Sequence, residues 1–307
     1  MRYKYRQIER HITNSAVYRL FEPYYKHLAF YFETEWYSTH IEVKTPARVK
    51  QMVDALARLP RGNGKPTIAF DLEAINLGRR GTTCYLQVRD LVEAQTYLVD
   101  ILTLQDKAFL TTSEDGTTLK DIFEDPGIIM LIFDGRQDAD ALYWKHDVQV
   151  RGVVDLQTMA MLLREHPSLY RTSYISTMNQ YAGLSSKELR QWNLFKGYPF
   201  NGDYTIFKER PLPYRLKLYS IGDVLYLDRL YTNTAKRLTV RGLLLAHEWS
   251  RKQVEATWQA TWTSSKQYVD AGFNRCWEEQ INRMMKPAGP PLAAAPATDD
   301  DTDEEDV

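Results

Sequence analysis

The order of short apolar segments is the feature that most constrains how this chain can fold. Strands are predicted at residues 67–73, 82–88, 96–101, 127–133 and 153–155. Helices are predicted at residues 119–123, 137–146 and 156–165, in two or three pieces between 173 and 195, and at 213–233. Short polar links join the first three strands, which predicts hairpins, whereas the later strands alternate with helices. This order predicts an α/β fold with a mixed sheet flanked by helices.

A further helix is predicted before the first of these strands. Thr45 followed by Pro46 is a typical helix start, because the threonine side chain caps the helix and proline fits its first position. The helix is expected to reach about Leu59. Its apolar face consists of Val49, Met52, Val53, Leu56 and Leu59.

Composition divides the chain into four parts. Residues 1–40 are rich in Tyr, Phe and His and are predicted to pack as an arm onto the main domain, with stacking on nucleic-acid bases as the alternative. Residues 41–235 form the predicted main domain. Residues 236–285 have helical periodicity, which predicts a docked extension. Residues 286–307 combine Pro, Ala and an acidic block, which predicts a disordered tail whose role stays open.

The charge of the chain is divided unevenly. The last nine residues hold seven carboxylates, whereas residues 1–298 carry 39 Lys and Arg against 33 Asp and Glu. The resulting net charge of +6 on residues 1–298 is compatible with a polyanionic partner such as nucleic acid. It is equally compatible with charge that only keeps a protein in solution.

Several classes of protein are excluded by what the chain lacks. No apolar run reaches the roughly 18 residues of a membrane helix, and the first residues lack a secretory signal, so a soluble, intracellular protein with no membrane partner is expected. Cys84 and Cys276 are too few for a disulfide framework or a cysteine zinc site. The six histidines are scattered without an HxH or HxxxH pair, which disfavours a zinc hydrolase.

Asp71 and Glu73 follow the apolar segment of the first predicted hairpin strand, which is expected to stop at these acidic residues. Alternate residues of a strand point to the same face, so both carboxylates leave the sheet together. Two like charges side by side repel each other unless a cation lies between them, and hard oxygen ligands suit Mg²⁺ or Mn²⁺. A solvated strand end is the simpler explanation of this pair alone.

Tyr219 and Asp223 form a second candidate pair on the predicted helix at 213–233. Their four-residue spacing places the phenol and the carboxylate on one helical face, one turn apart. Amphipathic packing of Tyr219 and a surface ion pair of Asp223 are the structural alternatives.

A third group of acids lies where the strand at 127–133 runs into a helix. Asp134 is predicted to cap that helix. Asp138 and Asp140 lie in its first turns, and only one of them can face a cavity that the strand ends reach. Periodicity alone leaves open which one does.

These motifs together resemble a known family. The chain is similar to the 3′-5′ exonucleases of the ribonuclease D type, named DEDDy for four acids and a tyrosine. The resemblance lies in the order of three motifs: DLE on a first strand, an aspartate at a strand-to-helix junction, and YSIGD followed by VLYLDRLY on a late helix. The resemblance covers about residues 41–235, and VVDLQTMAMLL and ERPLPYRLKLYSIGDVLYL add to it. The segment DLEAINLGRRGT looks closest to the branch called exonuclease 3′-5′ domain-containing protein one and its fungal relatives.

The resemblance implies a fold and a set of ligands. The expected fold is ribonuclease H-like, a mixed sheet of five or six strands flanked by helices, with a helical C-terminal extension. The implied metal ligands are Asp71, Glu73, Asp138 and Asp223, which would hold two Mg²⁺ or Mn²⁺ ions; the family pattern selects Asp138 over Asp140. Tyr219 would orient or help to deprotonate the attacking water.

Further contacts with the substrate are weaker expectations. Arg79, Arg80 and Arg136 lie near the acidic segments and are candidates for phosphate contacts, with ordinary surface charge as the alternative. Leu77 or Tyr85 is a candidate for stacking on the terminal base.

The sequence therefore favours a 3′-5′ exonuclease that hydrolyses phosphodiester bonds of single-stranded nucleic acid, RNA rather than DNA. The alternative is a nucleic-acid-binding scaffold on the same fold with weak or no catalysis. Some members of the resembled branch lack part of the acidic set and act as inactive RNA-binding scaffolds, whereas this chain keeps the whole set. A protein-interaction module is a third, less favoured hypothesis. The substrate, the compartment, the oligomeric state and any protein partner are not specified by a motif.

Overall fold

The computed structural model describes residues 40–164, 168, 170–196 and 203–264 of the chain. The predictions for the aromatic arm, for residues 265–285 of the extension and for the acidic tail lie outside these residues. None of the helices in the described ranges is long and apolar enough to cross a membrane.

Six strands form a mixed sheet in the order β1-β4-β3-β2-β5-β6, as the α/β pattern predicts. The strands are β1 His40–Val43, β2 Pro66–Ile75, β3 Thr82–Asp90, β4 Gln95–Val99, β5 Ile129–Ile132 and β6 Val153–Asp155. The predicted hairpins are confirmed, because β2, β3 and β4 pair antiparallel in turn. The strands β1, β5 and β6 pair parallel with their neighbours, so the central strand β2 has an antiparallel partner on one side and a parallel partner on the other.

Helices surround this sheet. They are α3 Pro46–Leu56, α4 Ile101–Leu104, α5 Lys107–Leu110, α6 Leu119–Glu124, α7 Arg136–His146, α8 Leu156–Leu162, α9 Tyr174–Tyr181, α10 Ser186–Lys196, the 3₁₀ helix η1 Tyr204–Lys208, α11 Tyr214–Val224, α12 Leu227–Ala235 and α13 Val240–Thr257. The predicted start of α3 is confirmed, because the Thr45 side chain accepts a hydrogen bond from the Arg48 amide. The five predicted apolar residues of this helix and the turn after it are all buried.

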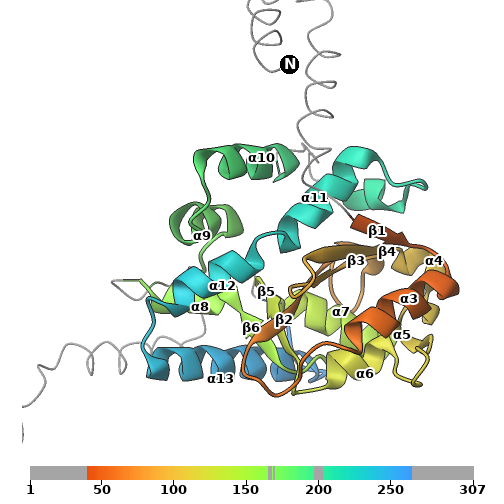
Figure 1. Cartoon of the computed structure of the whole chain (residues 1–307), viewed down its shortest axis with the longest axis horizontal. Coiled ribbons are helices and arrows are strands. Elements are labelled where there is room, and N and C mark those ends of the chain that lie inside the picture. Colours follow the sequence, from red (N-terminus) through yellow and green to blue (C-terminus); the bar gives the residue numbers. More distant parts are fainter. Residues whose placement is uncertain (1–39, 165–167, 169, 197–202, 265–307) are drawn as a thin grey trace, which may run out of the picture.

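The alternation of residues along β2 separates two cores. Phe70 and Leu72 pack into a core with α3, α6 and α7, whereas Ala69 belongs to a second core with α8 and α12. Figure 1 shows α3 and α6 on one side of the sheet and α11 and α12 on the other. Asp71 and Glu73 lie on the same face of β2 as Ala69. α11 covers this face and contacts β2 directly. The strand therefore presents both carboxylates to α11.

The predicted end of the first hairpin strand is wrong. β2 does not stop at Asp71 and Glu73 but continues to Ile75, with a bulge between Glu73 and Ala74 where the register against β3 shifts. The two acids consequently lie within a paired strand, next to the bulge. A bulge locally re-aims side chains, so the carboxylates gain a fixed direction that a frayed strand end would not provide.

The predicted helix at 213–233 is two helices. α11 ends at Val224 and α12 begins at Leu227, with Tyr226 in a non-helical conformation between them. The change of direction lets α11 pack on β2, β3 and β4 while α12 packs on α8 and α9. α12 also packs on β5 and β2, so both helices cover the sheet.

Asp134 does not cap α7 as predicted. Gly135 is the N-cap residue and makes no side-chain cap, while Asp134 has a left-handed backbone with φ of 55°. The Asp134 carboxylate instead accepts a hydrogen bond from Arg136 Nε at 2.7 Å. The side chain is used for an ion pair because this backbone turn directs it away from the first amides of the helix.

The first part of the predicted extension docks on the sheet domain. α13 packs against β6, α7 and α8. Ser250 Oγ accepts a hydrogen bond from the Asp155 amide at 2.9 Å, and Trp144 Nε1 donates to the Thr257 carbonyl at 3.0 Å. The first contact fixes α13 at the β6 edge of the sheet, and the second joins it to α7.

Candidate metal centre and nucleic-acid site

Three of the predicted acids converge between β2 and α11. Asp71, Glu73 and Asp223 each offer a carboxylate oxygen, and these atoms all lie within 4.8 Å of one another. Glu73 is buried and the other two are half-buried. Residues 150 positions apart in the sequence thus form one cluster, because α11 crosses the face of β2 that carries both strand carboxylates.

Asp138 approaches the same strand from α7. Its Oδ1 accepts a hydrogen bond from the amide of Leu72, the residue between Asp71 and Glu73, at 3.0 Å. The neighbouring candidate Asp140 accepts instead from the Arg79 backbone amide at 2.6 Å and from Arg79 Nε at 2.8 Å. Asp138 therefore contacts the strand between two of the clustered acids, whereas Asp140 is paired with Arg79; the role of Asp138 as a metal ligand stays a prediction.

The acids share an environment that resists several negative charges at once. Burial, and next the charge of Asp223, raise the pKa of Asp71 well above its usual range and that of Glu73 to about 8. Burial also raises the pKa of Asp138 to about 7. Such a cluster needs either protons or a cation to be stable.

The donor set fits a divalent cation. All candidate ligand atoms are carboxylate oxygens, which Mg²⁺ and Mn²⁺ prefer. Within the described residues, the buried Glu73 Oε1 has no hydrogen-bond partner. A buried oxygen without a partner is unfavourable in the metal-free site, and a metal ion at the cluster would satisfy it.

Lys196 is a site residue that the sequence analysis missed. Its ammonium group lies 2.6 Å from Oδ1 and 2.5 Å from Oδ2 of Asp223. The same group lies 3.2 Å from the centroid of the Tyr219 ring. No motif marks Lys196, and its position one turn after the buried Trp192 on α10 was the only hint in the sequence.

Tyr219 lies one turn before Asp223 on α11, as predicted, and packs against the core that contains Phe207. Burial, and next the charge of Asp223, raise the pKa of its phenol further above the usual value. The phenol is therefore neutral at physiological pH. It can orient a water molecule by hydrogen bonding, but it is a poor base by itself.

The end of α11 is held in place from α9 and α10. The Tyr174 hydroxyl donates to the backbone carbonyls of Asp223 at 2.9 Å and Gly222 at 3.2 Å. Trp192 Nε1 also donates to the Gly222 carbonyl, at 2.9 Å. These bonds fix the backbone that carries Asp223, so the carboxylate is positioned before any ligand arrives.

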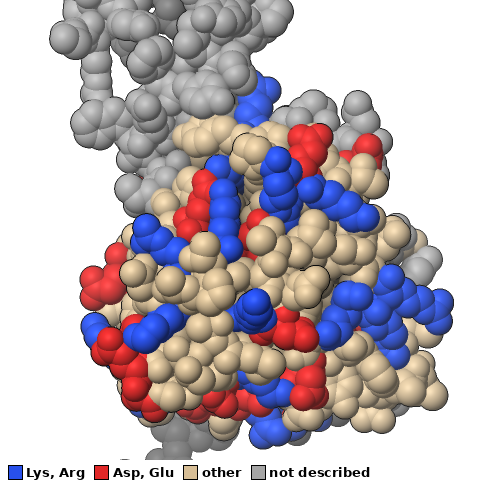
Figure 2. Space-filling model, turned by 90° about the vertical axis from the view of Figure 1, so that its right-hand side faces the viewer, with Lys and Arg blue, Asp and Glu red and all other residues tan. Residues whose placement is uncertain are grey.

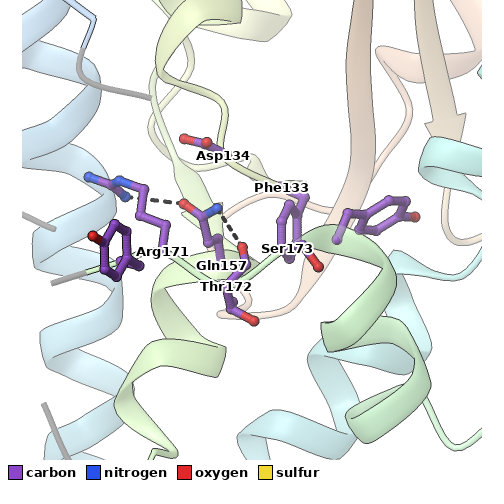
Figure 3. Close-up of a pocket in the computed structure, with 8 residues that line it drawn as sticks. Phe133, Asp134, Gln157, Arg171, Thr172 and Ser173 are labelled. Atoms are coloured by element: carbon purple, nitrogen blue, oxygen red, sulfur yellow. Dashed lines mark hydrogen bonds between the residues drawn. The ribbon is translucent and has the colours of Figure 1, made fainter. Parts of the chain in front are cut away.

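A cavity of about 440 Å³ adjoins this arrangement. Its lining residues are Phe133, Asp134, Gln157, Tyr170, Arg171, Thr172, Ser173 and Tyr174. In Figure 3, the Gln157 side chain lies between Arg171 and Thr172, accepting from the first at 3.1 Å and donating to the carbonyl of the second at 2.9 Å. Tyr174 connects the cavity to the backbone of α11, because its ring centroid lies 4.9 Å from that of Phe133 while its hydroxyl donates to the Asp223 carbonyl.

The expected phosphate contacts of two arginines are wrong. Arg79 forms an ion pair with the buried Asp140 and donates to the backbone carbonyls of Thr257, Gln259 and Ala260, so it holds the chain after α13. Arg136 is buried and paired with Asp134. Arg80 is exposed, and its role stays a prediction.

The expected stacking of Tyr85 on a base is also wrong. Tyr85 is only 1% exposed, and its ring lies 4.3 Å from the Arg210 guanidinium carbon. Leu77 is half-buried against the core on the α3 side of the sheet, and its contact with a base stays a prediction.

Charge is distributed unevenly over the surface. Figure 2 shows Lys and Arg side chains in several groups on one face of the described part, with acidic side chains between them. This mixed pattern agrees with the modest positive charge of residues 1–298 and does not by itself mark a path for nucleic acid.

Comparisons with known proteins agree with the fold. The profile of the 3′-5′ exonuclease family matches residues 40–239. Comparison with curated protein sequences finds no significant match.

Among solved structures, ribonuclease D from Trypanosoma brucei in complex with GMP is 24% identical, with a TM-score of 0.62 over 78% of this chain and 71% of that chain. Its complex with the RNA U12 is 22% identical, with a TM-score of 0.61 over 78% of each chain. Ribonuclease D from Escherichia coli is 19% identical, with a TM-score of 0.52 over 73% of this chain and 52% of that chain. The six-stranded mixed sheet and its helices are thus those of the ribonuclease H-like exonuclease fold.

The family profile covers more than half of the chain, and three of the expected acids meet between β2 and α11, with Asp138 bound to the backbone of β2. This chain belongs to the 3′-5′ exonuclease family.

Proposed function

We propose that the chain removes nucleotides from the 3′ end of single-stranded RNA by using two divalent ions. The convergence of Asp71, Glu73 and Asp223, with Asp138 bound to the strand between the first two, carries this proposal. Exonucleases of this family use divalent metal ions, and the all-carboxylate donor set suits Mg²⁺ or Mn²⁺.

Each acid has a place in the proposed site. Asp71, Glu73 and Asp223 would hold one ion, and Asp71 together with Asp138 would support the second. Bound divalent ions would supply activation of the attacking water and stabilisation of the charge that develops on the leaving 3′-oxygen. Tyr219, which stays neutral, would orient that water from the neighbouring turn of α11.

RNA is the favoured substrate for two reasons. The similar ribonuclease D structures from Trypanosoma brucei contain an RNA and GMP, which is the type of product that removal of one nucleotide releases. In this chain, the cavity beside Tyr174 is lined by three aromatic residues and by Arg171, which suits the base and phosphate of an adjoining nucleotide.

The substitution Asp71→Asn tests the proposed role of the acids. We expect it to lower the rate of RNA shortening by on the order of 100- to 1,000-fold, because removal of one charge-stabilising group from an active site commonly costs this much. The measurement follows the shortening of a 5′-labelled RNA in the presence of Mg²⁺ or Mn²⁺. A reaction with EDTA tests the need for metal, and a DNA oligomer of the same sequence tests the preference for ribose. Asp223→Asn should act similarly.

Glu93→Gln is the matched control, because it removes one exposed carboxylate in the β3–β4 turn and should leave the rate unchanged. Circular dichroism of each variant checks that the chain still folds. Full activity in folded Asp71→Asn and Asp223→Asn would disprove the proposal. Intact RNA that shifts in a gel would instead support the binding scaffold.

A further inference from the structure

Lys196 occupies the position at Asp223 that a metal ion would need. Its ammonium contacts both carboxylate oxygens, at 2.6 Å and 2.5 Å, and its side chain is only 8% exposed. The positive charge of Lys196 also lowers the pKa of Asp71 and Glu73, against the larger opposing effect of burial. One ammonium group thus serves as a counter-ion to three carboxylates.

The packing of α10 directs Lys196 to this position. Trp192 and Phe195 on the same helix are buried, and the Trp192 indole is hydrogen-bonded to the Gly222 carbonyl. A Cβ atom built on Gly222 would lie 3.2 Å from Cδ of Lys196, so the aliphatic stem of the lysine rests on this glycine, one residue before Asp223. The stem and the ammonium are therefore both held, unlike those of a surface lysine.

We propose that Lys196 is a built-in counter-ion that competes with the divalent ion for Asp223. This inference rests on the proposed metal site, and it concerns how that site is filled. The ammonium neutralises Asp223 in the metal-free chain and must leave its oxygens before a metal ion can use them, because two cations cannot share the same short contacts.

The competition has two consequences of opposite sign. Without the ammonium, the metal-free cluster of three carboxylates loses the cation that contacts Asp223, so the metal-free chain becomes less stable. Metal binding, in contrast, no longer has to displace a bound group, so its affinity rises. A lysine that only packed against Tyr219 would produce the first effect without the second.

The experiment measures Mn²⁺ binding and thermal unfolding of the full chain with Lys196→Met. Methionine keeps a linear stem of similar length and removes the charge. We expect a dissociation constant for Mn²⁺, from isothermal titration calorimetry or the decrease of the free Mn²⁺ EPR signal, at least about tenfold lower than that of the wild type. We also expect a lower midpoint of unfolding in EDTA and a larger upward shift with Mn²⁺.

Two further variants complete the experiment. Lys187→Met removes an exposed lysine from the first turn of the same helix and should change neither affinity nor midpoint. Lys196→Gln keeps a polar end group and supplies the binding measurement if the methionine variant does not fold in EDTA.

The outcomes separate this inference from the proposed function. Equal or weaker Mn²⁺ binding by Lys196→Met or Lys196→Gln, with binding by the wild type intact, would overturn the competition and leave the metal site standing. Binding by the lysine variants alone would support the competition and show that the native chain does not load its metal unaided. Absence of binding in every chain would overturn both proposals.

Discussion

At the scale of single residues, Asp138 and Asp140 are two buried carboxylates of α7 that contact different partners. Asp138 contacts the strand that carries the metal ligands, and Asp140 contacts Arg79, which in turn binds the chain after α13. Both are nearly inaccessible to solvent. We therefore propose a catalytic role for Asp138 and a structural role for Asp140.

Substitution of these two residues should separate activity from stability. Asp138→Asn keeps an acceptor for the Leu72 amide, so its free energy of unfolding in EDTA should not fall, while RNA shortening should be lost. Asp140→Asn breaks the ion pair with Arg79 and should lower the free energy of unfolding by about 2–3 kcal/mol. This loss is at or below the usual cost of breaking a buried ion pair, because Arg79 is partly exposed. Urea unfolding and the RNA assay on both variants measure this. Equal loss of stability in the two would contradict the division.

At the scale of elements, the C-terminal end of α7 is joined to the rest of the fold through His146. Its Nε2 lies 2.8 Å from Thr83 Oγ1 on β3, and its ring lies 4.8 Å from the ring of Phe109 on α5. Burial lowers the pKa of His146, while the nearby Asp106 partly opposes this shift. The junction between α7, β3 and α5 thus depends on a neutral imidazole.

This junction predicts a loss of stability in mild acid. The unfolded chain has an ordinary histidine pKa of about 6.5, whereas the folded chain holds a lower one, so below that pH the unfolded state binds more protons. The stabilisation is complete above about pH 6.5 and decreases as the pH falls through the folded pKa. In His146→Gln, which keeps a polar contact for Thr83, the unfolding midpoint should change less between pH 7 and pH 5. An identical pH profile of the two proteins would refute this role.

At the scale of the whole molecule, α13 completes the sheet domain. It covers β6 and α7, buries Ala246 and Val254 in different cores, and accepts the Asp155 amide through Ser250. Residues beyond 239, where the family profile ends, therefore contribute to the packing of the residues before it.

Truncation after Ala235 should consequently abolish cooperative unfolding, because it exposes one face of α7 and α8 and leaves the Asp155 amide without its partner. Circular dichroism during heating measures this. A chain that ends after residue 285, which lacks only the predicted disordered tail, is the control and should unfold at the wild-type midpoint. A cooperative transition in the shorter chain would show that residues 41–235 fold independently, as the predicted division into domains proposes.

Local signals in the sequence predicted many of the elements and suggested the candidate ligands. Thr45 and Pro46 defined a helix start, and alternation in the segment around Asp71 placed two carboxylates on one face, because capping and strand geometry depend only on neighbouring residues. The choice of Asp138 came from the family pattern, and the structure agrees with it.

The remaining features depended on contacts between distant segments. The break between α11 and α12 follows from which layers each half covers, and the internal roles of Arg79 and Tyr85 follow from partners more than 100 residues away, Thr257 and Arg210. Lys196 has no motif around it, and only the packing of α10 on Gly222 brings its ammonium to Asp223. Sequence patterns report short-range geometry, whereas the choice of an ionic partner is made when the chain closes, since charges interact through space and not along the backbone.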